Sequence, residues 1–154
     1  MFCWSFFEQK PESARTKSGA GVNFAAIGKM RREGVQAQVW ALGQQLQQSL
    51  RALAAKFPDL KLSIGGQPCA PSIAFGLGDD SPAGKALMIR GMLSRGYLFS
   101  SQLYVMHPHT EPMIHEMLST LEEVLTEVCR IQNEGRLQAE AGPQVVNTGF
   151  ARLA

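Results

Sequence analysis

One long amphipathic stripe constrains the fold of this chain more than any other feature. Between residues 35 and 57, apolar side chains recur at alternating steps of four and three residues, with mainly glutamines on the opposite side. The stripe consists of Val35, Val39, Leu42, Leu46, Leu50, Leu53 and Phe57. This spacing places all of them on one face of an α-helix, which Pro58 and Asp59 end. A helix with such a face needs a second layer of structure to cover it.

Short apolar runs follow this helix and indicate strands. Residues 60–64 alternate between apolar and polar side chains before a pair of glycines, which is the period of a half-buried strand that ends in a turn. Residues 72–77 form a second run between a proline and a glycine, and residues 97–101 form a third. The glycine-rich sequence of residues 8–21 predicts instead a loop or linker.

Two further helices are predicted, one on each side of the third strand. Asp80 or Ser81 is placed to cap the first and Gly96 to end it, while Thr110 is placed to cap the second. Their apolar stripes are Ala86, Leu87, Ile89, Met92 and Leu93 in the first, and Ile114, Met117, Leu118, Leu121, Val124, Leu125 and Val128 in the second. The order of elements predicts an α/β fold, a two-layer sandwich in which helices cover a small, mainly antiparallel sheet.

The composition narrows the compartment and the partners. A chain of 154 residues with 45% hydrophobic residues suits one globular domain, and its net charge of +2 is too small to favour nucleic acid as a partner. The three cysteines are far apart, which argues against a disulfide framework or a zinc site. The first seven residues are apolar but have no basic residue before them, and no apolar run approaches the ~20 residues of a membrane span. We therefore expect a cytoplasmic protein without membrane contact.

Clusters of polar residues offer no convincing catalytic or metal site. His107, His109 and His115 are close in sequence but lack a carboxylate or thiol at zinc spacing, so we interpret them as loop and helix-start residues, with His109 bonding the backbone at a turn. The adjacent acids Asp79 and Asp80 suit turn and cap chemistry, and residues 122–123 suit a solvated helix face. No nucleophile and base can be paired, and no catalytic, cofactor-binding or metal residue is predicted.

Five segments, in this order, carry a resemblance to a known family. They are Lys29 to Leu46 with its basic turn before a "G-x-x-L" step, Ile64 to Pro68 with a "G-x-P" turn, Gly91 to Leu98, His109 to Ile114, and Gly142 to Leu153 with "N-T-G-F-A-R-L". Together they span residues 24–153 and resemble class III pyridoxal-phosphate-dependent aminotransferases, in the branch of glutamate-1-semialdehyde 2,1-aminomutase. The resemblance covers the small C-terminal domain of that fold type I enzyme.

This resemblance implies a domain organisation and a chemistry. Residues 24–133 would form the aminotransferase small domain, residues 134–154 a partly ordered tail, and residues 1–23 a divergent segment in which Phe6 replaces a phosphate-binding threonine. The family transfers amino groups between small amino and keto substrates, as homodimers, on a pyridoxal phosphate held by a lysine of the large domain. The aminomutases carry a glutamate in the segment after the third strand, whereas this chain has Ser101 to Val105 there and a shorter run to His109, which favours an aminotransferase-like relative.

The lysine decides what the chain is expected to do. Its lysines are Lys10, Lys17, Lys29, Lys56, Lys61 and Lys85, and none has the family's context, so all are predicted to be surface residues. We expect a truncated family member that binds no pyridoxal phosphate alone and is inactive in isolation. Trp40, Leu103 and Met106 would be left partly uncovered, and a homodimer or a large-domain chain would cover them. The alternative is a non-catalytic binding or assembly domain that pairs with a separate large-domain chain.

Overall fold

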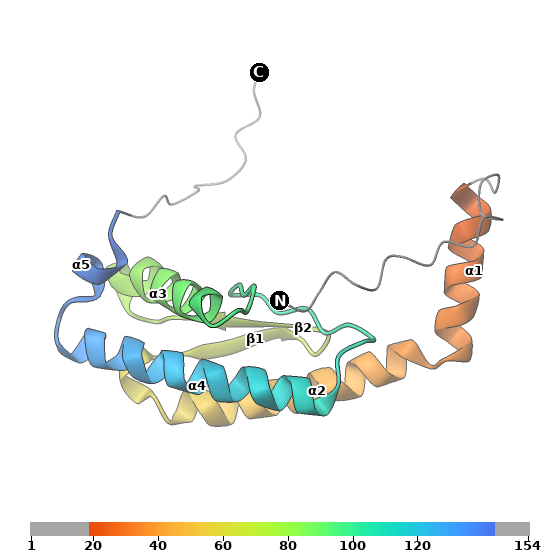
Figure 1. Ribbon diagram of the computed structural model, residues 1–154. Coiled ribbons are helices and arrows are strands. Elements are labelled where there is room, and N and C mark those ends of the chain that lie inside the picture. Colours follow the sequence, from red (N-terminus) through yellow and green to blue (C-terminus); the bar gives the residue numbers. More distant parts are fainter. Residues whose placement is uncertain (1–18, 144–154) are drawn as a thin grey trace, which may run out of the picture.

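The computed structural model describes the backbone of residues 19–143 and the side chains of residues 24–143. This part of the chain is α/β and mostly helical, with one small antiparallel sheet (Figure 1). Its elements are α1 (Gly19–Arg32), α2 (Val35–Ala55), the 3-10 turn η2 (Pro58–Leu60), β1 (Ser63–Gln67), β2 (Ala70–Ala74), the 3-10 turn η3 (Gly78–Asp80), α3 (Ser81–Ser94), α4 (Glu111–Asn133) and α5 (Leu137–Ala141).

Helix α2 confirms the amphipathic stripe. Its buried face carries Leu42, Leu46, Leu50 and Leu53, which are all at most 7% exposed. The helix ends at Ala55, so Phe57 is buried but lies beyond the helix to which the sequence pattern assigned it. The backbone of Phe57 has φ −123° and ψ 64°, because the helical conformation is disfavoured for a residue that precedes a proline.

A left-handed glycine separates α2 from α1. Gly34 has φ 60°, which breaks the helical path and turns α1 away from the axis of α2 (Figure 1). Helix α1 begins at Gly19, inside the glycine-rich run that we predicted to be a loop, so that prediction is wrong for residues 19–21. Helix α1 packs mainly on α2. It therefore forms an arm at one end of the molecule.

The sheet is a hairpin whose strands are displaced from the predicted ones. β1 and β2 pair antiparallel with Ile64 opposite Ile73, and the chain reverses at residues 68–69 instead of at the glycine pair. Gly66 lies within β1 at φ 82°, where a Cβ would lie 2.4 Å from the Ala70 carbonyl oxygen. The glycines that looked like a turn thus allow a twisted strand and a close approach of two backbones.

The predicted third strand at residues 97–101 is wrong, because the extended segment that pairs with β2 lies further along the chain. The Ile73 N–H donates to the Ser101 carbonyl at 2.8 Å, and the Leu103 N–H donates to the Pro71 carbonyl at 2.8 Å. The Val105 N–H continues the same register by donating to the Cys69 carbonyl at 2.9 Å. Pro71 has no N–H to return a bond to residue 103, so residues 101–105 pair with β2 without completing a regular ladder.

The helices pack around this sheet to form one core. Helix α2 contacts both strands, while α4 packs against α2 and α3, and α5 packs against α3 and α4 (Figure 1). Leu121, Val124 and Leu125 of α4 are at most 1% exposed, which confirms its predicted stripe. Leu93 of α3 is 57% exposed, so its predicted burial is wrong.

The predicted side-chain caps do not form. Asp80 and Thr110 occupy the N-cap positions of α3 and α4, but neither side chain makes a capping hydrogen bond. Pro82 and Pro112 are the second residues of these helices. A cap oxygen usually accepts a hydrogen bond from the N–H of the second or third helical residue, and proline lacks that N–H. The Ser81 hydroxyl instead accepts from the Leu77 N–H at 3.0 Å.

Candidate functional site

The three histidines do not gather into a metal site. His107 Nε2 lies 3.7 Å from a carboxylate oxygen of Glu33. His109 Nδ1 accepts the N–H of Met106 at 3.1 Å, and the N–H of His109 donates to the Met106 carbonyl at 3.0 Å. The interpretation of His109 as a residue that bonds the backbone at a turn is confirmed. Within residues 24–143, no group of three histidine, cysteine, aspartate or glutamate side chains could hold a metal ion.

The tautomer of His109 follows from this bond. Because Nδ1 accepts a hydrogen bond from the Met106 N–H, the neutral ring carries its own proton on Nε2. A metal ion at Nε2 would require the proton on Nδ1, where it would oppose the Met106 N–H. His109 is therefore a hydrogen-bond donor at Nε2.

The acidic pairs serve the packing of the described elements. An oxygen of Asp80 accepts from the Gln138 side-chain amide at 2.9 Å, which ties η3 to α5. Glu122 pairs with Lys56 at 2.6 Å, and Glu123 lies 3.6 Å from the Arg95 guanidinium. These contacts agree with the turn and helix-face roles predicted for the acids.

The described lysines lie at the surface. Lys29, Lys56, Lys61 and Lys85 are all exposed, as predicted from the sequence. Lys10 and Lys17, as well as Phe6 and the family-like residues 147–153, lie outside the described residues. Two apolar hollows among residues 24–143 remain as candidate sites.

The first hollow lies in the bend between α1 and α2, and we call it the arm corner. It has a volume of about 650 Å³ and is lined mainly by Ala26, Met30, Val39, Trp40, Cys69 and Met106. Trp40 is 46% exposed and Met106 is 55% exposed, while Leu103 nearby is half-buried. The prediction that these three residues are partly uncovered is confirmed.

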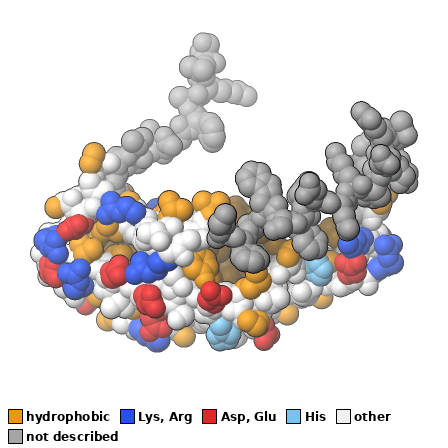
Figure 2. Space-filling view, viewed as in Figure 1, with side chains coloured by type: hydrophobic (Ala, Val, Ile, Leu, Met, Phe, Trp, Pro, Cys, Tyr) orange, Lys and Arg blue, Asp and Glu red, His pale blue; other side chains and the backbone are white. Residues whose placement is uncertain are grey.

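The arm continues this apolar surface. Phe24, Ile27 and Met30 recur at three-residue steps along α1, and each is about half exposed or more. A salt bridge between Lys29 and Glu33, 3.8 Å long, borders the hollow. Figure 2 shows that hydrophobic side chains also gather in the middle of the molecule, away from the arm. The arm corner and these three side chains form one apolar strip.

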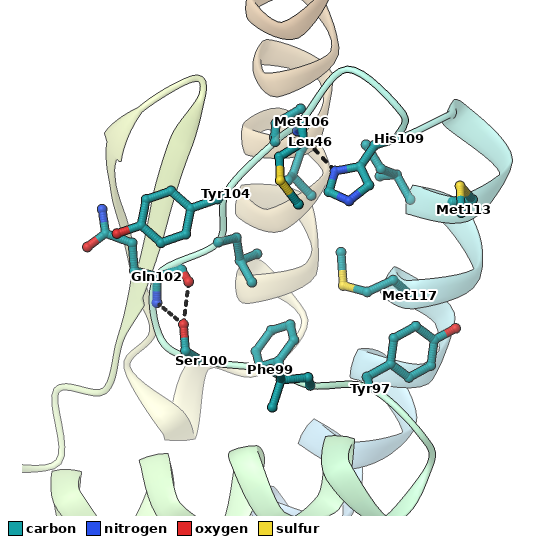
Figure 3. Close-up of a pocket in the computed structure, with 14 residues that line it drawn as sticks. Leu46, Tyr97, Phe99, Ser100, Gln102, Tyr104, Met106, His109, Met113 and Met117 are labelled. Atoms are coloured by element: carbon teal, nitrogen blue, oxygen red, sulfur yellow. Dashed lines mark hydrogen bonds between the residues drawn. The ribbon is translucent and has the colours of Figure 1, made fainter. Parts of the chain in front are cut away.

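The second hollow, the edge groove, lies between residues 97–106 and the first turns of α4 (Figure 3). It has a volume of about 560 Å³, and Leu46 of α2 lines it as well. Met113 and Met117 line it from α4, and no aspartate, glutamate, lysine or arginine is among its lining residues. His109 lies at one end and Ser100 at the other (Figure 3).

Sequence reasoning missed the edge groove because we assigned its wall to a strand four residues too early. A weak signal was present, since Leu98, Met106 and Met113 are apolar residues that each lie within two positions of a glycine or a proline and outside the predicted stripes. All three residues are more than half exposed in the structure.

Comparison of the chain with protein-family models, curated proteins and solved structures found no match. Among residues 19–143, no helix has both the length and the apolar character to cross a membrane.

Proposed function

We propose that this chain is an assembly domain, the small domain of a class III aminotransferase-like enzyme, and that it docks against a large domain that carries the catalytic lysine. The resemblance of five ordered segments supports this proposal, together with an α/β fold in which helices pack against a small antiparallel sheet. In the family this arrangement is a two-layer sandwich at the C-terminal end of fold type I.

The family-like segments pack on one another, which also supports the proposal. Gly43, in the first segment, lies so close to the second that a Cβ on it would be 2.0 Å from the Pro68 carbonyl oxygen. Tyr97 in the third segment and His109 in the fourth both line the edge groove. Residues that share a motif with a family are thus also the residues that shape the interior contacts.

The apolar strip on α1 is the observation that carries the assembly role. A helix of 14 residues is marginal alone in water, and the main packing partner of α1 among the described elements is α2. Its exposed Met30 lines the arm corner together with Trp40, and Ile27 is exposed on the same helix. Monomeric proteins seldom leave such apolar side chains uncovered. The resemblance places a large domain against these segments, and such a domain would cover them.

The chemistry would then be divided between the domains. Pyridoxal phosphate supplies the electron sink for amino-group transfer, and a lysine of the large domain would hold it. The described lysines of this chain are exposed and offer no enclosed position for that bond. The contribution of this chain would be to close the site and exclude water. A binding domain with no role in transamination is the alternative, and the same strip would serve it.

A cofactor titration tests the chemical half of the proposal. We expect no visible absorption band that survives dialysis when the chain is mixed with pyridoxal phosphate, because its described lysines are exposed. Borohydride reduction followed by peptide mapping checks each lysine. A stable band that maps to one lysine of this chain would contradict the proposal.

A docking experiment tests the assembly half. We expect the chain to form a complex with a lysine-bearing large-domain chain of a class III aminotransferase, through an interface of ordinary size, ~1,600 Å². Its melting temperature should rise, because a partner that binds only the folded state stabilises that state. Met30→Lys should weaken this complex, whereas Leu93→Lys, at a residue of similar exposure on α3, should not. Docking without any gain of transaminase activity would favour the alternative binding domain, and absence of docking would contradict both.

A further inference from the structure

The free side of residues 101–106 forms an unpaired sheet edge next to the edge groove. Residues 101, 103 and 105 direct their backbone bonds to β2. Because the bonding direction alternates along an antiparallel strand, residues 102, 104 and 106 direct their N–H and C=O groups away from β2. In Figure 3 this side of the segment faces α4 across the groove.

Neighbouring residues of the protein itself bond the backbone groups at both ends of this edge. The Gln102 N–H donates to the Ser100 hydroxyl at 3.2 Å, and that hydroxyl donates to the Gln102 carbonyl. At the other end, the Met106 N–H and carbonyl are both bonded to His109. Natural sheets often protect exposed edges in this way, because open edges recruit other chains.

Tyr104 remains open between the two closed ends. No hydrogen bond among the described residues involves its N–H or its carbonyl. One residue of an extended, antiparallel chain would satisfy both groups by exchanging two hydrogen bonds with Tyr104. The neighbours of that residue would lie opposite Leu103 and Val105, and their side chains would point to the same face of the sheet.

That face is the apolar floor of the edge groove. Leu103, Ile114 and Met117 are partly buried there, and Met113 is 54% exposed. The lining carries no aspartate, glutamate, lysine or arginine, so it suits uncharged apolar side chains. A cavity of about 560 Å³ is within the usual range for a small ligand or a few side chains.

We propose that the edge groove binds a short extended peptide, which pairs with the backbone of Tyr104 as an added strand. Three consecutive residues of this peptide have the pattern apolar, any residue, apolar. The middle residue of the peptide exchanges both backbone bonds with Tyr104, and the two apolar side chains fill the groove. A second copy of the chain fits less well than a peptide. Its own α4 lies across its own groove, and it would meet the α4 of the first copy (Figure 3).

Peptides with single N-methyl groups test the backbone bonds. The probe is a labelled, blocked pentapeptide Ser-Val-Thr-Val-Ser, followed by fluorescence polarisation. N-methylation of the threonine removes the N–H that would donate to Tyr104 and should abolish binding, whereas N-methylation of either valine removes an N–H that faces away and should change the Kd about twofold at most. Equal binding of the two kinds of N-methyl peptide would overturn the proposal.

Matched variants and amide exchange test the location. Met113→Lys should weaken binding of the probe about tenfold by placing a charge in the groove, while Met30→Lys, at a similarly exposed residue of α1, should leave it unchanged.

The Tyr104 amide should exchange quickly in the free chain and slowly with the peptide bound. Slow exchange without peptide in a chain that sediments as a dimer would overturn the proposal in favour of a second copy. Because Met30 belongs to the arm corner, failure here is distinguishable from failure of large-domain docking.

Discussion

At the scale of single residues, two contacts between α2 and the hairpin set their close packing. Gly43 lets the helix approach the Pro68 backbone directly. Gln47, which is 7% exposed, donates from its side-chain amide to the Gly66 carbonyl at 2.9 Å and to the Gly65 carbonyl at 3.3 Å. A buried amide with satisfied bonds fixes the position of β1 on the helix, because leaving these groups unpaired would be costly.

The close approach at Gly43 predicts a large effect of a single methyl group. In Gly43→Ala the added Cβ would lie 2.0 Å from a backbone oxygen, so the hairpin must move and the free energy of unfolding should fall by ~1–3 kcal/mol. Gly28→Ala is the matched control, since its Cβ would meet only the end of Arg32 at 3.5 Å. Urea denaturation measures both variants. Equal stability of the two would mean that α2 and the hairpin are not packed this closely.

At the scale of elements, each of the two long helices contributes at least as many residues to the core as any other element. Leu46 of α2 is 3% exposed, and Leu121 of α4 is fully buried. The strands contribute less, because each has only five residues and β2 is interrupted for pairing by Pro71. The helices therefore hold the sheet in place more than the sheet organises the helices.

Truncation of a mid-stripe leucine tests this view. Leu46→Ala and Leu121→Ala should each lower the free energy of unfolding by ~2–5 kcal/mol, because each removes a side chain that is at most 3% exposed. Leu93→Ala, at a residue that is 57% exposed, should change it by less than ~0.5 kcal/mol. Losses below ~1 kcal/mol at both core positions would show that the stripes are not buried in solution.

At the scale of the whole molecule, the described residues form a core with an arm at one end. Helix α1 is joined to the rest through Gly34 and packs mainly on α2 (Figure 1). The apolar strip formed by this arm and the arm corner lies outside the core. Such a shape suits a domain that is completed by another chain or domain.

The exposed strip predicts association at high concentration. The chain should bind a hydrophobic dye and sediment faster as its concentration rises, because Ile27, Met30 and Trp40 are uncovered. The triple variant Ile27→Gln, Met30→Gln, Trp40→Gln should reduce both effects without lowering the melting temperature of the core. A wild-type chain that stays monomeric and binds no dye would show that the strip drives no association.

The sequence alone determined the α/β class and the helices α2, α3 and α4, because a long helix repeats the same apolar spacing over many residues. The predicted cap residues, Asp80 or Ser81 for α3 and Thr110 for α4, lie within one residue of where these helices begin. It also indicated correctly that His109 bonds the backbone at a turn, since the prolines around it restrict the chain.

The tertiary structure decided where the hairpin turns. Gly65 and Gly66 have the local signal of a turn, but their role depends on Gln47 and Ala70, which are distant or paired across the sheet. It also decided the third extended segment and its open edge, because pairing with β2 is a contact between residues about 30 positions apart that no local pattern encodes.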